Sequence, residues 1–155
     1  MKDRPGYKLQ TLPVGAEVIA LDISQIDVPE VRSRLFEDWM DHGLLIFRDL
    51  PVTNAQHLQL SRVFGYLELH PLHEIRNEEE PLLINLGGKK PTRAYVYDED
   101  KLCVDRIAWH RDTAYTAEIC KGAMLRIIER PEEGGHTDFC DTEKAYDALT
   151  EDLKE

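Results

Sequence analysis

The sequence has no excess of basic residues: 30 acidic residues stand against 19 lysines and arginines, which gives a formal net charge of -11. Because phosphate binding needs a basic face, this balance excludes nucleic acid as an expected partner. The sequence also has no apolar run that approaches the length of a bilayer crossing and no signal-peptide pattern at its start. We therefore expect a soluble, cytoplasmic protein without membrane contact. A small anionic ligand stays compatible with this charge, since it needs only one or two local basic side chains.

Cysteine is also scarce, and Cys103, Cys120 and Cys140 form an odd set without a C-x-x-C pair. This pattern predicts free thiols in a reducing compartment, where they serve as small buried apolar residues. The sequence contains no internal repeat and no low-complexity segment. Its 155 residues are the length of a single domain, which can bury about 68–70% of its unfolded surface.

The spacing of apolar residues predicts a mixed α/β architecture that is mainly β, with most strands antiparallel. Asp27, Pro29 and Gly43 provide a cap, a first turn and an exit for the first helix. Thr53 and Gln56 form a capping box that opens the second helix. The predicted helices cover residues 29–42, 53–63 and 142 onward, and the predicted strands cover residues 7–12, 16–22, 44–47, 67–71, 95–97, 123–128 and 137–140.

A metal-binding pattern occurs at residues 109–112, which read Trp-His-Arg-Asp. In an extended backbone the side chains of His110 and Asp112 point to the same side. An imidazole and a carboxylate supply two of the three ligands of a 2-His-1-carboxylate site for Fe(II). Trp109 is interpreted either as an apolar wall beside the metal or as a core residue. His42 and His57 lie in or beside helices and are interpreted as structural histidines.

Beyond this pair, the sequence resembles the taurine dioxygenase (TauD/TfdA-like) family of Fe(II)- and 2-oxoglutarate-dependent oxygenases. A lone H-x-D pattern is weak, but here it belongs to an ordered series of motifs with family-like spacing. The resemblance runs over most of the chain. The motifs that carry it are Gly-Ala-Glu-Val at 15–18, His-Gly-Leu-Leu-Ile-Phe-Arg-Asp at 42–49, Phe-Gly at 64–65, His-Pro at 70–71, Trp-His-Arg-Asp at 109–112, Gly-Gly-His-Thr at 134–137 and Ala-Tyr-Asp-Ala-Leu at 145–149.

The resemblance implies a double-stranded β-helix (jelly roll) with flanking helices, in which His110 and Asp112 are iron ligands. It also implies that Thr137 hydrogen-bonds a carboxylate of 2-oxoglutarate and that His70 lies near the substrate. The implied cofactors are Fe(II), 2-oxoglutarate as cosubstrate, and O₂. The implied reaction releases succinate and CO₂ and hydroxylates an unactivated C–H bond of a small-molecule substrate. Family members form homo-oligomers, dimers or tetramers, and the sequence does not choose between them.

Two family residues have no counterpart in the sequence: the second iron-binding histidine and the arginine that anchors the far carboxylate of 2-oxoglutarate. His136 is the one histidine after Asp112, and it replaces the aspartate of the family's Gly-Gly-Asp-Thr motif. We interpret His136 as a turn substitution and not as the third ligand. A jelly roll needs about eight strands, and too few follow Trp109. We therefore expect residues 1–155 to be the N-terminal part of a dioxygenase domain, with weak iron binding and no turnover by themselves.

Two further departures concern the substrate. His73 stands where taurine-specific members have a phenol, and Arg106 stands where they have an amide. Taurine itself is therefore disfavoured, and another sulfonate, an alkyl sulfate, an aryloxyalkanoate or a small carboxylic acid remains open. Two other functions also stay open. One is a non-catalytic binding or assembly module that retains part of the oxygenase fold. The other is a hydrolytic His/Asp metal protein, for which the sequence shows neither a general base nor a nucleophile.

Overall fold

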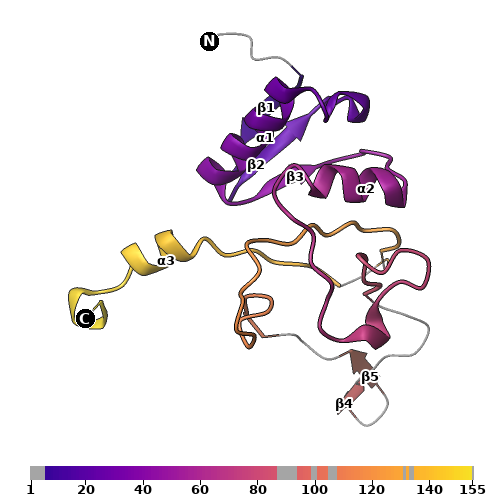
Figure 1. Cartoon of the computed structure of the whole chain (residues 1–155). Helices are drawn as coiled ribbons and strands as arrows, with labels where there is room; N and C mark the ends of the chain where they lie inside the picture. The colour runs from indigo at the N-terminus through magenta and orange to yellow at the C-terminus, as the bar shows by residue number, and fades with distance from the viewer. Residues whose placement is uncertain are drawn as a thin grey trace. The chain divides into compact units, whose positions relative to one another are not determined.

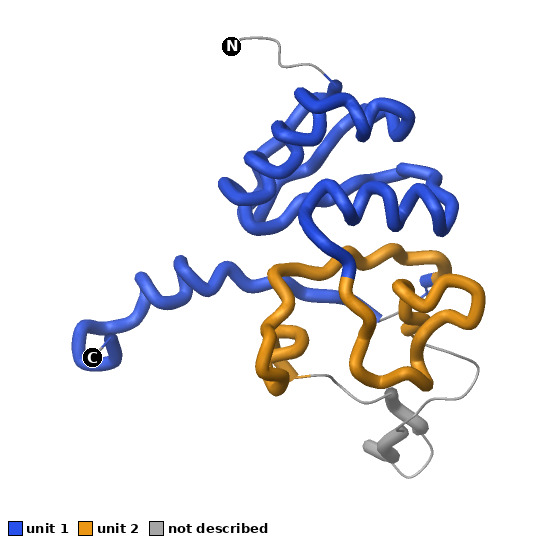
Figure 2. Tube along the Cα trace, in the orientation of Figure 1, with its two compact units in different colours: residues 1–67, 130–155 blue, residues 68–129 orange. Residues whose placement is uncertain are grey.

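A computed structural model describes residues 6–86, 94–98, 101–104, 108–130, 132 and 135–154, with only the backbone described at 94–98 and 101–104. The chain divides into two compact units (Figure 2). One unit comprises Met1–Leu67 and Arg130–Glu155, and the other comprises Glu68–Glu129. The described residues form a mixed α/β structure with two small sheets and few helices. Within these residues the sheets do not make a double-stranded β-helix.

The first unit contains a three-stranded sheet in the order β1-β2-β3 (Figure 1). Strand β1 (Lys8–Thr11) pairs antiparallel with β2 (Ala16–Ile19), and β2 pairs parallel with β3 (Leu45–Phe47). Parallel neighbours need a long crossover, which helix α1 (Pro29–His42) provides after the short 3-10 helix η1 (Ile23–Gln25). The strand predicted at residues 16–22 ends three residues earlier than expected, because Ala20 adopts a positive φ of 59°.

Helix α1 confirms the predicted range, with a proline in its first turn and Gly43 at its C-cap in a left-handed conformation. The predicted cap was wrong, because Val28 occupies the N-cap and makes no side-chain capping bond. Asp27 instead accepts hydrogen bonds from Arg32, at 3.4 Å, and from Gln59. These bonds link the start of α1 to the second helix.

Helix α2 (Asn54–Ser61) confirms the predicted capping box. The Gln56 backbone N–H donates to the Thr53 hydroxyl at 3.2 Å, and the Thr53 backbone N–H donates to the Gln56 side chain at 2.9 Å. The helix begins one residue later and ends two residues earlier than predicted, because Thr53 is its N-cap and residues 62–63 form a turn. His57 is buried on this helix and His42 is half-buried at the end of α1, which suits their structural interpretation.

The core of the first unit combines aliphatic packing with one buried polar cluster. Ile26, Leu35 and Val31 are the largest fully buried side chains. Beside them, the Tyr7 hydroxyl donates to Asp38 at 2.5 Å, and Arg34 donates to the Tyr7 carbonyl at 2.7 Å. The Arg34 guanidinium also lies 3.8 Å from the centroid of the Tyr7 ring and 3.5 Å from the Asp38 carboxylate. This cluster attaches the segment that leads into β1 to the inner face of α1.

Several predicted strands do not form. Strand structure is absent at residues 67–71, 123–128 and 137–140. The unit Glu68–Glu129 contains an antiparallel hairpin of β4 (Ala94–Asp98) and β5 (Lys101–Val104). An isolated bridge also joins Arg76 to Ile84. Apolar alternation cannot build a strand alone, because its backbone groups need a neighbouring strand. Ile127 and Ile128 are accordingly 70% and 76% exposed.

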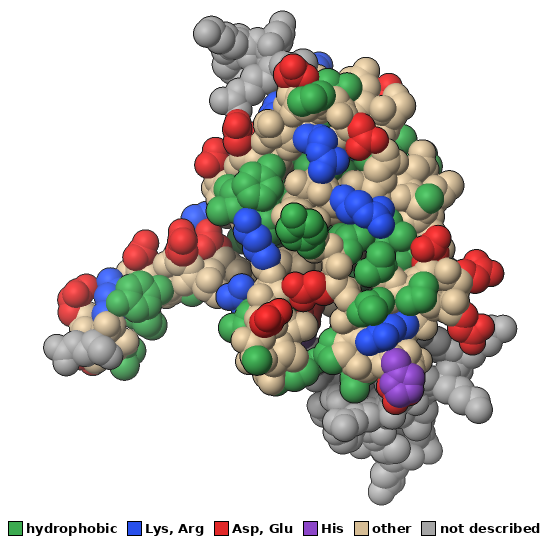
Figure 3. Space-filling view, viewed as in Figure 1, with side chains coloured by type: hydrophobic (Ala, Val, Ile, Leu, Met, Phe, Trp, Pro, Cys, Tyr) green, Lys and Arg blue, Asp and Glu red, His purple; other side chains and the backbone are tan. Residues whose placement is uncertain are grey.

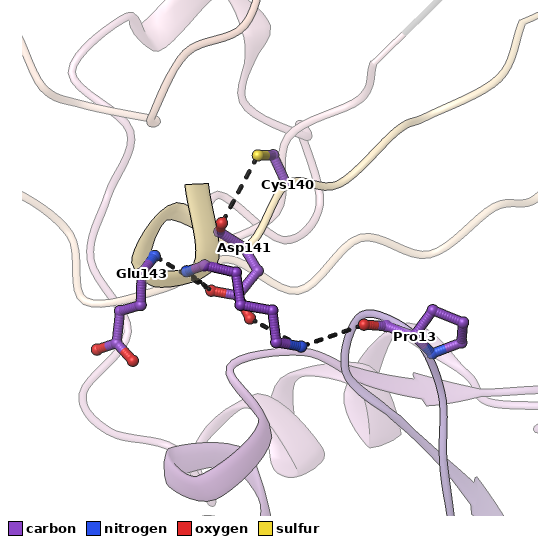
Figure 4. Close-up of polar contacts among 5 residues, drawn as sticks. Pro13, Cys140, Asp141 and Glu143 are labelled. Carbon is purple, nitrogen blue, oxygen red and sulfur yellow. Dashed lines mark hydrogen bonds and ion pairs between the residues drawn. The ribbon is translucent and has the colours of Figure 1, made fainter. Parts of the chain in front are cut away.

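Helix α3 (Thr142–Asp147) is shorter than predicted, and the 3-10 helices η2 (His73–Ile75) and η3 (Glu151–Leu153) complete the helical elements of the described residues. Asp141 caps α3 by accepting from the backbone N–H groups of Glu143 and Lys144, both at 3.1 Å (Figure 4). The Lys144 ammonium lies 3.3 Å from the Asp141 carboxylate and donates to the Pro13 carbonyl at 3.2 Å. The first turn of α3 is therefore linked to the turn between β1 and β2.

The surface is acidic, and on the face seen in Figure 3 the carboxylates are scattered and do not gather in one patch. Cys120 and Cys140 are free thiols, as predicted, but Cys120 is half-buried and Cys140 is exposed, so their predicted burial was wrong. The side chain of Cys103 lies outside the described residues. Within the described part of the chain, no helix combines the length and the apolarity that a bilayer crossing requires.

The contact of β2 with β3 generates a stability prediction for Gly15. Gly15 has a φ of +77°, and a Cβ there would lie 2.5 Å from the Leu44 carbonyl oxygen, which accepts a 2.9 Å hydrogen bond from the Ala16 N–H. Gly43 has a similar φ of +70°, but a Cβ added there would meet no atom within 4 Å. Substitution of Gly43 therefore measures the cost of the positive φ without a steric clash. Gly43→Ala should cost about 1–2 kcal/mol for the left-handed backbone. Gly15→Ala should cost about 1–3 kcal/mol more, because it overpacks the strand junction. Urea unfolding measures both, and equal losses would contradict the close approach.

The cap of α3 generates a pH prediction. The backbone N–H of Lys144 is the main cause that holds the pKa of Asp141 below its ordinary value, with the Lys144 side chain and the Glu143 N–H adding to it and partial burial opposing it. The cap therefore stabilises α3 fully above the ordinary carboxyl pKa of about 3.9 and is lost as pH falls through the lowered value. Carboxyl-carbon NMR titration of Asp141 should show this lowered pKa. In Lys144→Gln the pKa of Asp141 should stay lowered, because the backbone N–H of residue 144 is kept. A return of the Asp141 pKa to its ordinary value would show that the ion pair with Lys144 causes the lowering.

Candidate metal centre

His110 and Asp112 lie together in the unit Glu68–Glu129. The Nε2 atom of His110 is 3.1 Å from an Asp112 carboxylate oxygen, so the prediction that the two side chains face each other is confirmed. The backbone is not a strand, however, because Asp112 begins a turn that continues to Tyr115. The pair is therefore brought together by a loop and not by the alternation of an extended strand.

Both side chains of the pair are open to solvent, with exposed fractions of 54% for His110 and 61% for Asp112. Neither is enclosed in apolar packing that would exclude a metal ion. Trp109 is 63% exposed, so its interpretation as a core residue was wrong for the described structure. Its role as a wall beside a metal stays a prediction. The pair has the donor atoms, one imidazole nitrogen and one carboxylate, that fit Fe(II).

A backbone carbonyl fixes the orientation of the His110 ring. The Nδ1 atom lies 2.8 Å from the Ala108 carbonyl oxygen, and this hydrogen bond is the main reason why the pKa of His110 is raised above its ordinary value. Partial desolvation lowers the pKa, and the Asp112 carboxylate raises it. In the neutral ring the proton on Nδ1 donates to Ala108, which leaves the Nε2 lone pair facing Asp112. This is the tautomer that a metal ligand needs, with a carbonyl as its outer partner.

His70 lies in the same unit, half-buried, and is held by two neighbours. Its Nδ1 atom accepts a hydrogen bond from the Leu72 N–H at 3.2 Å. Its carbonyl oxygen accepts from Arg76 through Nε, at 2.7 Å, and through Nη2. Because Nδ1 is an acceptor, the neutral ring carries its proton on Nε2. His70 therefore presents a donor that suits an anionic oxygen.

His136 and Thr137 belong to the unit that contains Arg130–Glu155, and both are exposed. Among the described residues, no three side chains of His, Cys, Asp or Glu come close enough to hold a metal ion. The structure thus brings together His110 and Asp112 and adds no third ligand to them there. The interpretation of His136 as a turn substitution and not as the third ligand stays a prediction. Arg106 and Gly134 lie outside the described residues.

The structure shows two features of the site that the sequence did not identify. One is the Ala108 carbonyl, and the other is the turn of the chain after Asp112. A backbone carbonyl has no sequence signature, because every residue carries one. The reversal uses Thr113 with a φ of +55°, a conformation that a β-branched residue rarely adopts. Side-chain types could have suggested neither group.

Comparison with known proteins identifies the family of the chain. A family model described as "Taurine catabolism dioxygenase TauD, TfdA family" matches residues 6–155. The (S)-phenoxypropionate/alpha-ketoglutarate-dioxygenase of Sphingobium herbicidovorans is 33% identical over 118 residues, which are 75% of this chain and 38% of that protein. The alpha-ketoglutarate-dependent 2,4-dichlorophenoxyacetate dioxygenase of Cupriavidus pinatubonensis is 29% identical over an alignment of 159 positions, which covers 88% of this chain and 52% of that protein.

A third relative, the alkylsulfatase of Acinetobacter baylyi, is 27% identical over 149 residues, which cover 92% of this chain and 41% of that protein. The chain thus spans about half the length, or less, of these curated relatives. The match to the family model nevertheless runs over nearly the whole chain and includes the His110–Asp112 pair. On this evidence the chain belongs to the taurine catabolism dioxygenase TauD, TfdA family.

Proposed function

We propose that this chain forms the N-terminal part of an Fe(II)- and 2-oxoglutarate-dependent dioxygenase that hydroxylates an unactivated C–H bond of a small organic anion. The observation that carries the proposal is the contact between His110 and Asp112, 3.1 Å apart and open to solvent, with the ring anchored on Ala108. Membership of the family supports it, as do the names of relatives that depend on alpha-ketoglutarate.

In this proposal His110 Nε2 and the Asp112 carboxylate hold the iron, and the Ala108 carbonyl keeps the imidazole in the ligating tautomer. The Thr137 hydroxyl donates a hydrogen bond to a carboxylate of 2-oxoglutarate. Bound iron supplies the chemistry that couples decarboxylation of 2-oxoglutarate by O₂ to C–H hydroxylation, with succinate and CO₂ released. Three protein ligands on one face of the metal leave sites for the cosubstrate and O₂.

The remaining parts of the centre are assigned to the complete protein outside residues 1–155. These parts are the third ligand, a second histidine, and an arginine for the far carboxylate of 2-oxoglutarate. The missing strands of the jelly roll are assigned to the same region. Curated relatives of about twice this length support the assignment.

The names of the relatives support an anionic substrate. They refer to phenoxypropionate, 2,4-dichlorophenoxyacetate, an alkyl sulfate activity and a sulfonate. Carboxylates, sulfate esters and sulfonates are all anions near neutral pH. We propose that His70 binds such an anion through its Nε2–H, since the Leu72 N–H occupies Nδ1. The second candidate, a non-catalytic binding module, is favoured by the lack of a third ligand among the described residues.

The first test distinguishes the proposed ligands from His136 in the complete protein. His110→Ala and Asp112→Ala should each lower 2-oxoglutarate decarboxylation by more than about 100-fold, because loss of a ligand exceeds the 10–100-fold effect of outer partners. His136→Ala should leave most of the activity. Succinate release is measured with a sulfonate, a sulfate ester and an aryloxy carboxylate. Equal losses in all three variants would show that His136 is misassigned, and no succinate from the unaltered protein would favour the binding module.

The second test concerns the proposed cosubstrate contact. Thr137→Ala should raise the KM for 2-oxoglutarate about 10–100-fold, because a hydrogen bond to a charged group contributes about 1.5–3 kcal/mol. Thr137→Ser keeps the hydroxyl and should stay near the original KM. The kcat at saturating 2-oxoglutarate should change little in either variant. An unchanged KM in Thr137→Ala would remove Thr137 from the cosubstrate site.

A further inference from the structure

The loop that follows the metal pair is closed on itself through one residue, Cys120. Arg111 donates from its guanidinium to the Cys120 carbonyl at 3.3 Å. The Cys120 thiol donates to the Asp112 carbonyl at 3.7 Å, and the Cys120 backbone N–H donates to the Thr113 hydroxyl at 2.8 Å. Three consecutive residues, with Asp112 at their centre, therefore contact the same partner across the loop.

Thr113 is the strained member of this loop. Its φ of +55° lies in the left-handed region, which threonine avoids because its branched Cβ crowds the backbone. Such a conformation persists only where the surroundings hold it. Here the Thr113 hydroxyl accepts from Cys120, and its carbonyl accepts from the Thr116 N–H at 3.0 Å. Thr113, Thr116 and Cys120 are also the half-buried residues of the segment 111–120, whose other residues are exposed.

This arrangement adjoins the Asp112 carboxylate in the chain. The chain reverses at Thr113, one residue after the ligand, and the reversal leaves the carboxylate 3.1 Å from His110 Nε2. The contacts that hold the reversal do not use the carboxylate itself, which stays available to a metal. A ligand pair that is ordered before binding avoids the entropic cost of being ordered by the metal.

We propose that Thr113 is a positioning residue for the metal centre, whose hydroxyl, held by the Cys120 N–H, keeps the Asp112 carboxylate directed at the site where His110 binds the metal. The inference rests on the proposed function, because it assumes that His110 and Asp112 bind iron. In this proposal the hydroxyl acts through Asp112, because its own partner is the Cys120 N–H.

The test uses Co(II) as a spectroscopic probe in the complete protein, titrated without substrate. Thr113→Val has nearly the same shape but no hydroxyl, and it should raise the Co(II) Kd about 10–100-fold, as loss of an outer partner does. It should also change the ligand-field bands of the bound Co(II), a signature that general destabilisation does not move. Thr113→Ser restores the hydroxyl and should return both readouts to those of the unaltered protein.

Two further variants keep the test decisive. Thr113→Gly removes the hydroxyl and also relieves the positive φ, so it folds without strain and should still lose Co(II) affinity. Thr150→Val removes an exposed threonine hydroxyl that makes no capping bond and should have no effect. Unchanged Co(II) binding in Thr113→Val and Thr113→Gly, or failure of Thr113→Ser to restore it, would overturn the inference. No binding by the unaltered protein, or equal binding by His110→Ala, would instead overturn the proposed function.

Discussion

In the unit that contains the N-terminal sheet, the Asp38 carboxylate accepts a hydrogen bond from the Tyr7 hydroxyl and faces the Arg34 guanidinium inside the core. A buried pair of this kind holds only while each charge keeps its partner, and removal of one partner typically costs about 3–5 kcal/mol. Because Tyr7 immediately precedes β1 and the other two residues lie on α1, the pair fixes where the first strand meets the helix. Beyond this attachment, β1 pairs with β2, and β2 pairs with β3.

The candidate metal centre is held together in a different way. Its contacts join residues that are at most nine positions apart, from the Ala108 carbonyl to the Cys120 backbone. A local loop of this kind does not need the sheet to define the geometry of His110 and Asp112. This explains how a ligand pair can be arranged within residues 108–120 while the third ligand is assigned to another part of the protein. It also explains why a strained residue, Thr113, lies beside the pair, since a short loop has few ways to reverse.

Structure that depends on neighbouring residues was predicted from the sequence, whereas structure that depends on distant residues was not. Helix α1 was predicted to the residue and the capping box of α2 was confirmed, because helix signals act over one or two turns. The expected strand at 123–128 did not form, because a strand is defined by a neighbour that the alternation of its own residues cannot specify. In the site, residue types identified His110 and Asp112, but neither the Ala108 carbonyl nor the positive φ of Thr113 has a sequence signature. Asp27 shows that even a good capping residue can be used elsewhere, here on Arg32 and Gln59.

A net charge of -11 disfavours an organic anion as ligand, but the groups that contact the anion resolve this conflict locally. At physiological ionic strength, charges more than about 8 Å apart are largely screened in water, so scattered surface carboxylates oppose an approaching anion only weakly. The decisive groups are those in contact with it, and His70 has its Nδ1 occupied by the Leu72 N–H and its carbonyl held by Arg76. Such a ring can offer Nε2–H to a carboxylate, sulfate or sulfonate oxygen without being charged itself. In the proposed enzyme a neutral imidazole donor therefore binds the substrate anion, and a carboxylate binds the iron.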